Sequence, residues 1–291
     1  MPWDKKWFQF SALMLLAFVW GSSFILMKIG LKSFDSVQAA ALRIGFASLV
    51  LLPVSLRHLK SLKRKDVIPL LVAGFVGSLI PAFLFTKAQT RIDSALAGML
   101  NSLTPVFTLV VGLVFFGIKK KISQVIGISL GLLGALGLIT SGNDVSLANV
   151  NSYAFFIVAA TICYAFNINV VKNYLTHLNG VQITALSFFF IGPVAIVYFF
   201  TSDINQAIQN ENWLLHLGAL AILGIVGTAL AMLMMNTLIR YTSAVFASSV
   251  TYVIPIFAIM WGLLDGETVT VFHLLFMGVV LLGVYLINRK K

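Results

Sequence analysis

The stretch DSVQAAALRIGFASLVLLP, residues 35–53, is an apolar run long enough to cross a bilayer, and it holds one permanent charge, Arg43. A spanning helix needs about 20 mostly apolar residues to cross roughly 30 Å of hydrocarbon. The rest of the chain has the same character: 59% of its 291 residues are hydrophobic, 10% are charged, and the mean hydropathy is +0.99. Such a chain has too little polar material to cover a soluble globule, so the sequence predicts a membrane protein.

Runs of this kind recur along the whole chain and leave no length for a soluble domain. We therefore expect an all-α integral membrane protein with ten transmembrane helices. The runs lie approximately at residues 10–29, 37–56, 67–87, 94–116, 122–140, 150–171, 181–200, 213–235, 243–264 and 270–287.

The charged residues are distributed unequally between the two sides of the predicted membrane. If the N-terminus is cytoplasmic, most of the 20 Lys and Arg fall on the cytoplasmic side, whereas most Asp and Glu fall on the outer side. This distribution predicts that both termini are cytoplasmic. It also explains the net charge of +11 without a nucleic-acid partner. The first run is long enough to remain as a span and is not expected to be a cleaved signal peptide. The single cysteine, Cys163, excludes an intramolecular disulfide.

The two halves of the chain resemble each other. Lys28 and Gln38 match Lys172 and Gln182 at an offset of 144 residues, and Pro105 matches Pro255 at an offset of 150. We expect two repeats, residues 1–143 and 144–291, with five spans each. Because five is odd, the second repeat enters the membrane from the opposite side, and inverted repeats around a central cavity are typical of secondary transporters. A duplication retained only for packing is the alternative.

Several motifs resemble the EamA-type drug/metabolite transporters, the ten-helix group of that superfamily. They are WGSSF at 20–24, LR at 42–43, SALAGMLNSLTP at 94–105, SAVFASSVTYVIP at 243–255 and GE at 266–267. The resemblance implies a ten-helix fold around a central cavity, lined by spans one, three, four, six, eight and nine, and export or exchange of small metabolites such as amino acids. The GIKKK stretch at 117–121, where the second half has GE, departs from this pattern and leaves the substrate open.

The charged residues within the spans are the cations Lys28, Arg43 and Lys87, whereas every Asp and Glu falls in a loop or at a span boundary. The absence of an embedded carboxylate argues against proton-driven export of cationic drugs and favours zwitterions or substrates with a carboxylate or phosphate. It also predicts that replacing Asp93 or Glu267 by the amide leaves transport nearly unchanged. Arg43 is either a tie between helices or an attractor of anions. Lys28 and Lys87 either extend to the membrane surface or act in gating.

The candidate substrate site consists of aromatic and uncharged polar residues in the cavity helices: Trp20, Ser23, Asn101, Thr104, Tyr164, Asn167, Asn236, Ser248, Thr251 and Tyr252. Such side chains can stack on a substrate and hydrogen-bond it, although they also make ordinary hydrogen bonds between helices. Pro105 and Pro255 predict helix kinks that open backbone groups to the cavity. The glycines of GISLGLLGALG, residues 127–137, predict close packing against the tenth span, or a homodimer interface.

The sequence thus predicts an inner-membrane secondary transporter of small metabolites that works by alternating access, and the family resemblance implies that it is an exporter. Its partners would be a small-molecule substrate and the lipid bilayer. The alternatives are an exchanger or facilitator of phosphorylated or nucleotide-linked solutes, and a membrane-embedded lipid-handling enzyme or scaffold. No phosphate-binding loop, metal motif or catalytic triad is readable, so we expect no enzyme, cofactor or metal.

Overall fold

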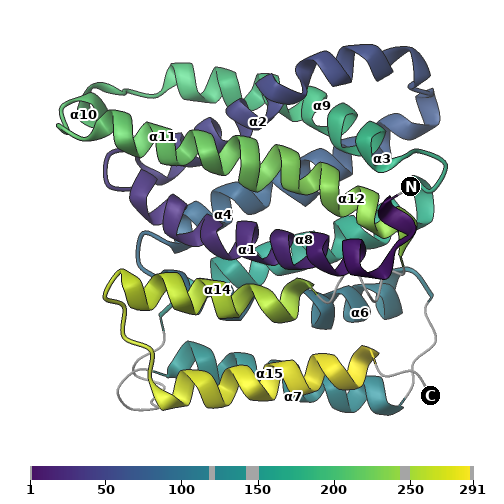
Figure 1. Ribbon diagram of the computed structural model, residues 1–291, viewed down its shortest axis with the longest axis vertical. Coiled ribbons are helices and arrows are strands. Elements are labelled where there is room, and N and C mark those ends of the chain that lie inside the picture. Colours follow the sequence, from purple (N-terminus) through teal and green to yellow (C-terminus); the bar gives the residue numbers. More distant parts are fainter. Residues whose placement is uncertain (1, 118–121, 142–150, 243–249, 289–291) are drawn as a thin grey trace.

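The computed structural model describes residues 2–117, 122–141, 151–242 and 250–288, and all regular structure in these ranges is helical (Figure 1). The α-helices are α1 (Lys6–Gly30), α2 (Ser36–His58), α3 (Val67–Gly74), α4 (Ile80–Ala88), α5 (Ser94–Asn101), α6 (Thr104–Phe115), α7 (Ile122–Thr140), α8 (Ala154–Tyr174), α9 (Gly180–Thr201), α10 (Asn205–Ile208), α11 (Trp213–Gly224), α12 (Ala231–Tyr241), α14 (Val250–Leu264) and α15 (Val271–Asn288). The described chain also contains three short 3₁₀ turns: η1 (Pro2–Asp4), η2 (Leu59–Ser61) and η3 (Arg64–Asp66).

Eight helices of the described chain are long and apolar enough to cross a membrane: Lys6–Gly30, Ser36–Ser61, Arg64–Ala88, Ser94–Phe115, Ile122–Thr140, Ala154–Tyr174, Gly180–Thr201 and Trp213–Leu238. Two shorter apolar helices, Val250–Leu264 and Val271–Ile287, lie where the ninth and tenth runs were expected. Large apolar side chains face outward, among them Phe200 at 80% and Val271 at 77% exposure. In a bilayer these side chains contact lipid, and helices satisfy their own backbone hydrogen bonds there.

Two long helices begin with the same cap. The Asp35 carboxylate accepts hydrogen bonds from the backbone N–H groups of Val37 and Gln38, while the Gln38 side chain accepts from the N–H of Asp35. Asn179 and Gln182 form the equivalent reciprocal pair at the start of α9. Each cap satisfies N–H groups that the first helical turn leaves free, which explains why α2 and α9 begin sharply at these residues.

Two spans contain a π-helical segment. The segment η4 (Phe75–Leu79) joins α3 to α4, and η6 (Ile225–Leu230) joins α11 to α12. Such segments widen the helix and leave backbone carbonyls less completely bonded, so they are common at functional sites. Both occupy the third span of their half of the chain.

The two matched prolines occupy different positions in their helices. Pro255 lies inside α14, where the predicted kink stays a prediction. Pro105 instead lies in the first turn of a new helix, α6, because the span breaks after Asn101. A proline costs little there, since the first-turn N–H has no intrahelical acceptor to lose.

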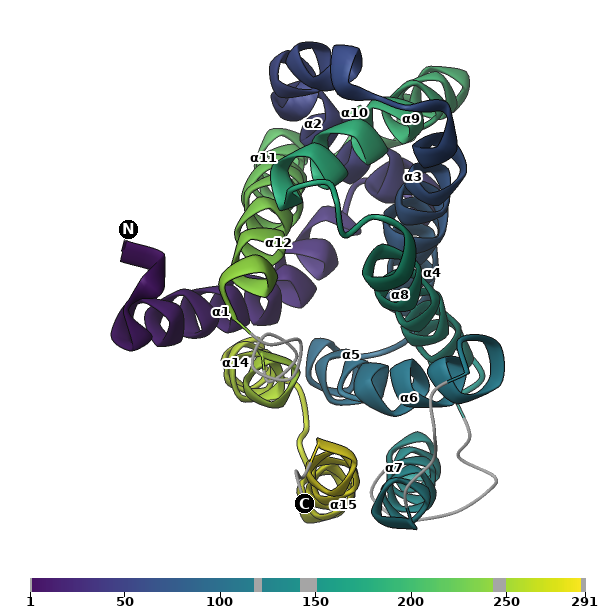
Figure 2. The same ribbon diagram turned by 90° about the vertical axis from the view of Figure 1, so that its right-hand side faces the viewer.

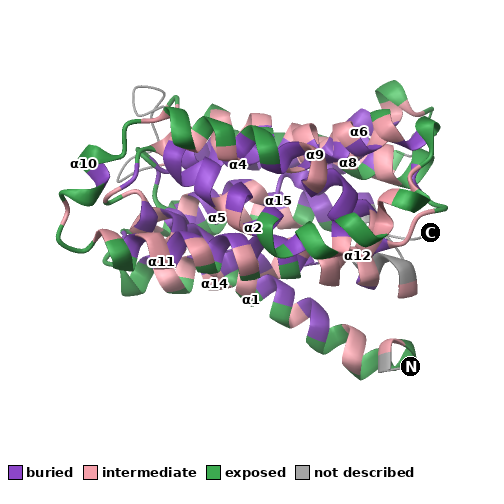
Figure 3. Cartoon of the chain, turned by 90° about the horizontal axis from the view of Figure 1, so that it is seen from above, coloured by how far each residue is buried: buried purple, intermediate pink, exposed green. Residues whose placement is uncertain are grey.

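The helices pack in pairs that join the two halves of the chain. α2 packs against α9, α1 against α14 and α7 against α15. The α7 and α15 pair lies at one edge of the molecule in both Figure 1 and Figure 2. A Cβ on Gly127 would come within 2.5 Å of the carbonyl oxygen of Gly283, so the glycine face of α7 contacts α15, as the first of its two interpretations predicted. The first turns of α1 extend away from the bundle (Figure 3).

Candidate functional site

The first part of the site is a contact between α1 and the π-helical segment η6. The indole Nε1 of Trp20 donates a hydrogen bond of 3.1 Å to the backbone carbonyl of Gly227. Ser23 lies one turn further along α1, where a Cβ on Gly227 would come within 2.9 Å of its Oγ. Glycine at 227 therefore lets α1 approach the backbone of η6, and the π-helical geometry leaves the carbonyl able to accept from Trp20.

Arg43 lies beside this contact. Its Nε donates a hydrogen bond of 2.8 Å to Oγ1 of Thr228, and its side chain lies near the phenol of Tyr164 on α8. The Tyr164 ring stacks on Phe85 of α4, with centroids 6.1 Å apart. Within the described residues, the two terminal nitrogens of Arg43 donate to no protein group. Since the Arg43 side chain is only half-buried, these nitrogens can meet an anionic group. We call Trp20, Arg43, Tyr164, Gly227 and Thr228 the Arg43 cluster.

A small cavity of about 20 Å³ lies between η4, α8, α9 and α12. Its polar lining comes from Ser78, Asn167, Thr184, Ser187 and Asn236. The Asn236 side-chain amide donates a 2.7 Å hydrogen bond to Thr184 Oγ1. Asn167 Oδ1 and Ser187 Oγ are buried without a hydrogen-bond partner in the described chain. We call this hollow the Ser187 cavity.

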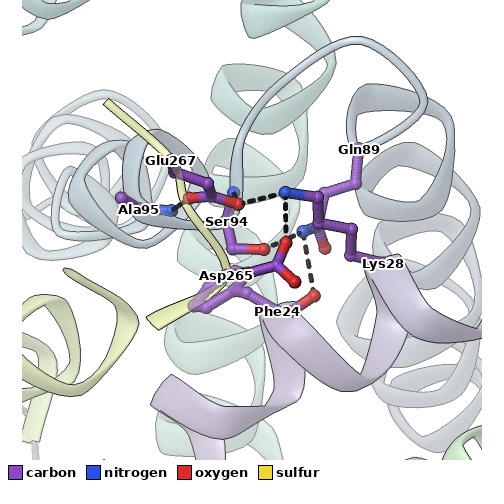
Figure 4. Close-up of polar contacts among 7 residues, drawn as sticks. All are labelled: Phe24, Lys28, Gln89, Ser94, Ala95, Asp265 and Glu267. Atoms are coloured by element: carbon purple, nitrogen blue, oxygen red, sulfur yellow. Dashed lines mark hydrogen bonds and ion pairs between the residues drawn. The ribbon is translucent and has the colours of Figure 1, made fainter. Parts of the chain in front are cut away.

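A group of charges connects three segments at the end of the bundle where α1 finishes (Figure 4). Lys28 Nζ lies 2.7 Å from both Asp265 Oδ2 and Glu267 Oε1. The two Glu267 oxygens also accept hydrogen bonds of 2.9 Å from the backbone N–H groups of Ser94 and Ala95. These N–H groups are the free donors at the start of α5, where the helix dipole favours a negative charge. We call these five residues the Glu267 cluster.

Two neighbours complete the environment of this cluster. Gly266 adopts φ of +80°, a conformation that glycine reaches without strain, and this turn directs Glu267 back toward α5. The side-chain amide of Gln89 bonds the carbonyl of Phe24 and Oγ of Ser94. In the loop before α5, burial and the nearby Glu267 charge raise the pKa of Asp93 above its usual range. The sequence placed Glu267 in a loop, which is correct, but its side chain is only 2% exposed.

The structure brings some of the predicted residues together and separates others. Trp20, Arg43 and Tyr164 meet in the Arg43 cluster, and Ser23 adjoins it. Asn167 and Asn236 line the Ser187 cavity.

The remaining predicted residues lie elsewhere. Thr104 Oγ1 donates to the carbonyl of Asn101 at the break between α5 and α6. The Tyr252 hydroxyl contacts the backbone of Val284 on α15. Thr251 is half-buried on α14, Lys87 is exposed near the end of α4, and Ser248 lies outside the described residues.

Sequence reasoning missed the residues that oppose the predicted ones. Gly227 and Thr228 complete the Arg43 cluster, and Ser187 contributes an unpaired hydroxyl to the cavity. The signal available was the matched glycine pair, Gly77 and Gly227, at the same offset of 150 residues that relates the two prolines.

Comparison with known proteins gives three related findings. The profile of the EamA-like transporter family matches residues 7–140 and again residues 151–289. The inner membrane transporter YedA of Escherichia coli strain K12 is 30% identical over 288 residues, which cover 97% of this chain and 91% of YedA. A transporter of Archaeoglobus fulgidus is 26% identical, over 99% of this chain and all of that one.

One more distant relative and one solved structure are also similar to this chain. The S-adenosylmethionine/S-adenosylhomocysteine transporter of Chlamydia trachomatis serovar L2 is 24% identical, over 95% of this chain and 88% of that protein. A solved crystal structure superposes with a TM-score of 0.64 at 14% identity, covering 95% of this chain and 96% of that one. The latter likeness concerns the fold alone.

Proposed function

The chain belongs to the EamA-like transporter family and is a multi-pass transporter of the inner membrane, and on this premise we propose that it carries small zwitterionic or anionic metabolites by alternating access. The family match confirms the resemblance seen in the sequence motifs. The family and the relatives also place the chain among transporters rather than enzymes, which removes the lipid-handling enzyme from the alternatives.

The proposed mechanism requires two inverted repeats, and contacts that recur with the halves exchanged support them. Ser33 Oγ lies 2.6 Å from Nδ1 of His216, and His177 Nε2 lies 3.0 Å from Oδ1 of Asp66. Ser33 matches His177 at an offset of 144, and Asp66 matches His216 at an offset of 150. Exchanging the halves therefore turns one contact into the other, as a two-fold axis in the membrane plane would do.

Ten spans fit this arrangement. They are α1, α2, α3 to α4, α5 to α6, α7, α8, α9, α11 to α12, the helix that ends at Leu264, and α15. The two separate family matches support repeats at residues 1–143 and 144–291. The connection between α2 and α3, which lies on the same side as the N-terminus, carries Lys60, Lys63, Arg64 and Lys65. That cluster supports cytoplasmic termini, and it makes the Glu267 cluster the outer end of the bundle.

The proposed substrate class rests on the environment of Arg43. Its terminal nitrogens are free of protein acceptors in the described chain, and they lie beside the Tyr164 phenol and the Thr228 hydroxyl that Arg43 Nε already bonds. A guanidinium within a membrane protein attracts a carboxylate or phosphate, and the neighbouring aromatics Trp20 and Tyr164 offer apolar faces for the rest of a substrate. Amino acids and their derivatives meet both requirements.

The chlamydial relative favours one refinement of this class. The substrates in its name, S-adenosylmethionine and S-adenosylhomocysteine, join an amino acid to a nucleoside. Such a molecule would present a carboxylate to Arg43 and a flat base to Trp20 or Tyr164. It unites the amino-acid class with the nucleotide-linked alternative. Export is the direction that the family resemblance implies, and exchange is the alternative.

Uptake into liposomes tests the proposal. Purified protein is reconstituted and assayed with labelled amino acids, S-adenosylmethionine and a phosphorylated sugar, with and without a pH gradient. We expect saturable flux of at least one zwitterion or anion, inhibited by unlabelled substrate and strongly reduced in Arg43→Gln. Flux of cationic drugs alone, or equal flux in Arg43→Gln, would contradict the proposed substrate class.

A further inference from the structure

The Ser187 cavity contains polar atoms that the protein itself leaves unsatisfied. Ser187 is only 3% exposed, yet its hydroxyl has no partner in the described chain, and the same is true of Asn167 Oδ1. Buried oxygens of this kind are nearly always bonded to protein, water or an ion. Because both atoms belong to residues that line one hollow, from the different helices α8 and α9, we infer that a ligand binds there.

The size and chemistry of the hollow restrict this ligand. A volume of about 20 Å³ holds one water molecule or one dehydrated small ion. Thr184 already donates to the carbonyl of Gly180 and accepts from Asn236, so the lining atoms without a partner in the described chain are two oxygens, Asn167 Oδ1 and Ser187 Oγ. Neutral oxygens bind hard cations, and the lining has no carboxylate to balance a second charge. A singly charged cation is therefore the ion that fits.

The other half of the chain contains a cation at the equivalent position. Arg43 matches Ser187 at an offset of 144, and Thr228 matches Ser78 at an offset of 150. The backbones correspond too: a Cβ on Gly74 would come within 2.9 Å of the Ser187 carbonyl, and one on Gly224 within 2.6 Å of the Arg43 carbonyl. In the outer half the guanidinium bonds Thr228, whereas in the cytoplasmic half a serine leaves the space open.

We propose that the Ser187 cavity binds one monovalent cation, Na⁺, which takes the place in the cytoplasmic half that the Arg43 guanidinium takes in the outer half. Residues from both repeats line the cavity, so the bound ion joins η4 and α8 to α9 and α12. This inference rests on the proposed transport function and names its coupling ion. K⁺ binds more weakly, because its larger radius lengthens its contacts with the neutral oxygens and so weakens their attraction.

Thermal melting in detergent tests the inference without any transport measurement. The protein is titrated with NaCl against choline chloride at constant ionic strength, and KCl serves as the comparison ion. We expect Tm to rise saturably with Na⁺, as for a ligand that binds only the folded state, and less with K⁺. Identical melting in Na⁺ and choline would mean that the cavity holds only water, and would overturn the inference.

Three variants test whether the Na⁺-dependent rise in Tm arises from binding in the Ser187 cavity. Ser187→Ala removes one oxygen and is expected to abolish the Na⁺ response. Ser48→Ala is the matched control, because Ser48 is also a buried serine without a partner but contacts Gly192 at the crossing of α2 and α9. It should keep the full response. Ser187→Lys supplies a tethered ammonium and should melt in choline as the parent melts in Na⁺. A Na⁺ response retained in Ser187→Ala, or lost in Ser48→Ala, would overturn the assignment.

Different results would contradict the proposed transport function and the proposed cation site. A chain that binds Na⁺ through Ser187 but carries no metabolite in liposomes would refute the transport class and support the cation site. A chain that carries metabolites but shows neither ²²Na⁺ binding nor a Na⁺-dependent Tm would refute the cation site alone.

Discussion

Lys28 Nζ and Glu267 Oε1 lie 2.7 Å apart, although 239 positions separate the two residues in the sequence. The contact joins the first span to the loop between α14 and α15, and Glu267 extends it to the start of α5 through Ser94 and Ala95. A carboxylate with 2% side-chain exposure is thus bonded on both oxygens. The Glu267 cluster closes the proposed outer end of the bundle.

Replacing Glu267 by glutamine is expected to destabilise the protein by about 2–4 kcal/mol, because the amide leaves Lys28 without its buried partner and cannot accept at both oxygens. The sequence-based prediction for this variant concerns substrate flux, which is nearly unchanged if transport is not coupled through an embedded acid, and it stays a separate prediction. Asp265→Asn is the matched control, since Asp265 contacts the same lysine but has a side chain 31% exposed. Its cost should stay below about 1 kcal/mol. Equal melting temperatures for the two variants would refute the role of Glu267 burial.

Arg43→Ala is expected to lower the melting temperature in detergent, because it removes the tie between α2 and η6 and leaves Thr228 Oγ1 without its donor. Thr228→Val keeps the side-chain volume and removes the acceptor, so it should reproduce part of the loss, about 1–2 kcal/mol. Ligand binding measured on the folded fraction separates the two roles of Arg43. Normal melting of Arg43→Ala combined with abolished substrate binding would leave anion attraction as its role and exclude the tie.

The pH dependence of stability should respond to Asp93. Burial and the adjacent Glu267 charge raise its pKa in the folded protein, so the folded state holds this proton more tightly than the unfolded state does. Ionised Asp93 therefore opposes folding above its raised pKa, and this opposition shrinks as the pH falls from that value to the ordinary pKa of the unfolded chain. We expect Asp93→Asn to melt higher than the parent near neutral pH, with a difference that shrinks in acid. Asp203→Asn, at an exposed loop position, is the control and should show no such trend.

The sequence predicted the parts of this fold that depend on periodicity and charge. Apolar runs marked the helices, and the glycines of residues 127–137 predicted the packing of α7 on α15. Of the candidate site, the sequence identified the residues that are conspicuous in an apolar run, such as Trp20, Arg43 and Tyr164. Thr228 and Ser187 were missed, because small hydroxyl residues are ordinary in membrane helices and gain meaning only from the backbone that faces them.

The break after Asn101 could not be predicted for a different reason. The sequence showed Pro105 inside a run of about 20 apolar residues, a pattern that fits a kinked helix and a broken one equally. The choice depends on whether Ser102 and Thr104 can satisfy the carbonyls that the break frees. In the structure both hydroxyls do so, bonding the carbonyls of Met99 and Asn101.

The two π-helical segments offer a last test, because their glycines face different neighbours. A Cβ on Gly77 would come within 2.4 Å of Asn167 Cγ, whereas one on Gly227 would come within 2.9 Å of the rotatable Ser23 hydroxyl. Gly77→Ala should therefore cost about 2–3 kcal/mol through overpacking, and Gly227→Ala about 1 kcal/mol or less. Gly218→Ala serves as the control, since a Cβ there meets no atom within 4 Å, and helix propensity should leave it neutral or slightly stabilising. Melting temperatures in detergent give the ranking, and a Gly227→Ala loss equal to that of Gly77→Ala would show that Ser23 is held as rigidly as Asn167.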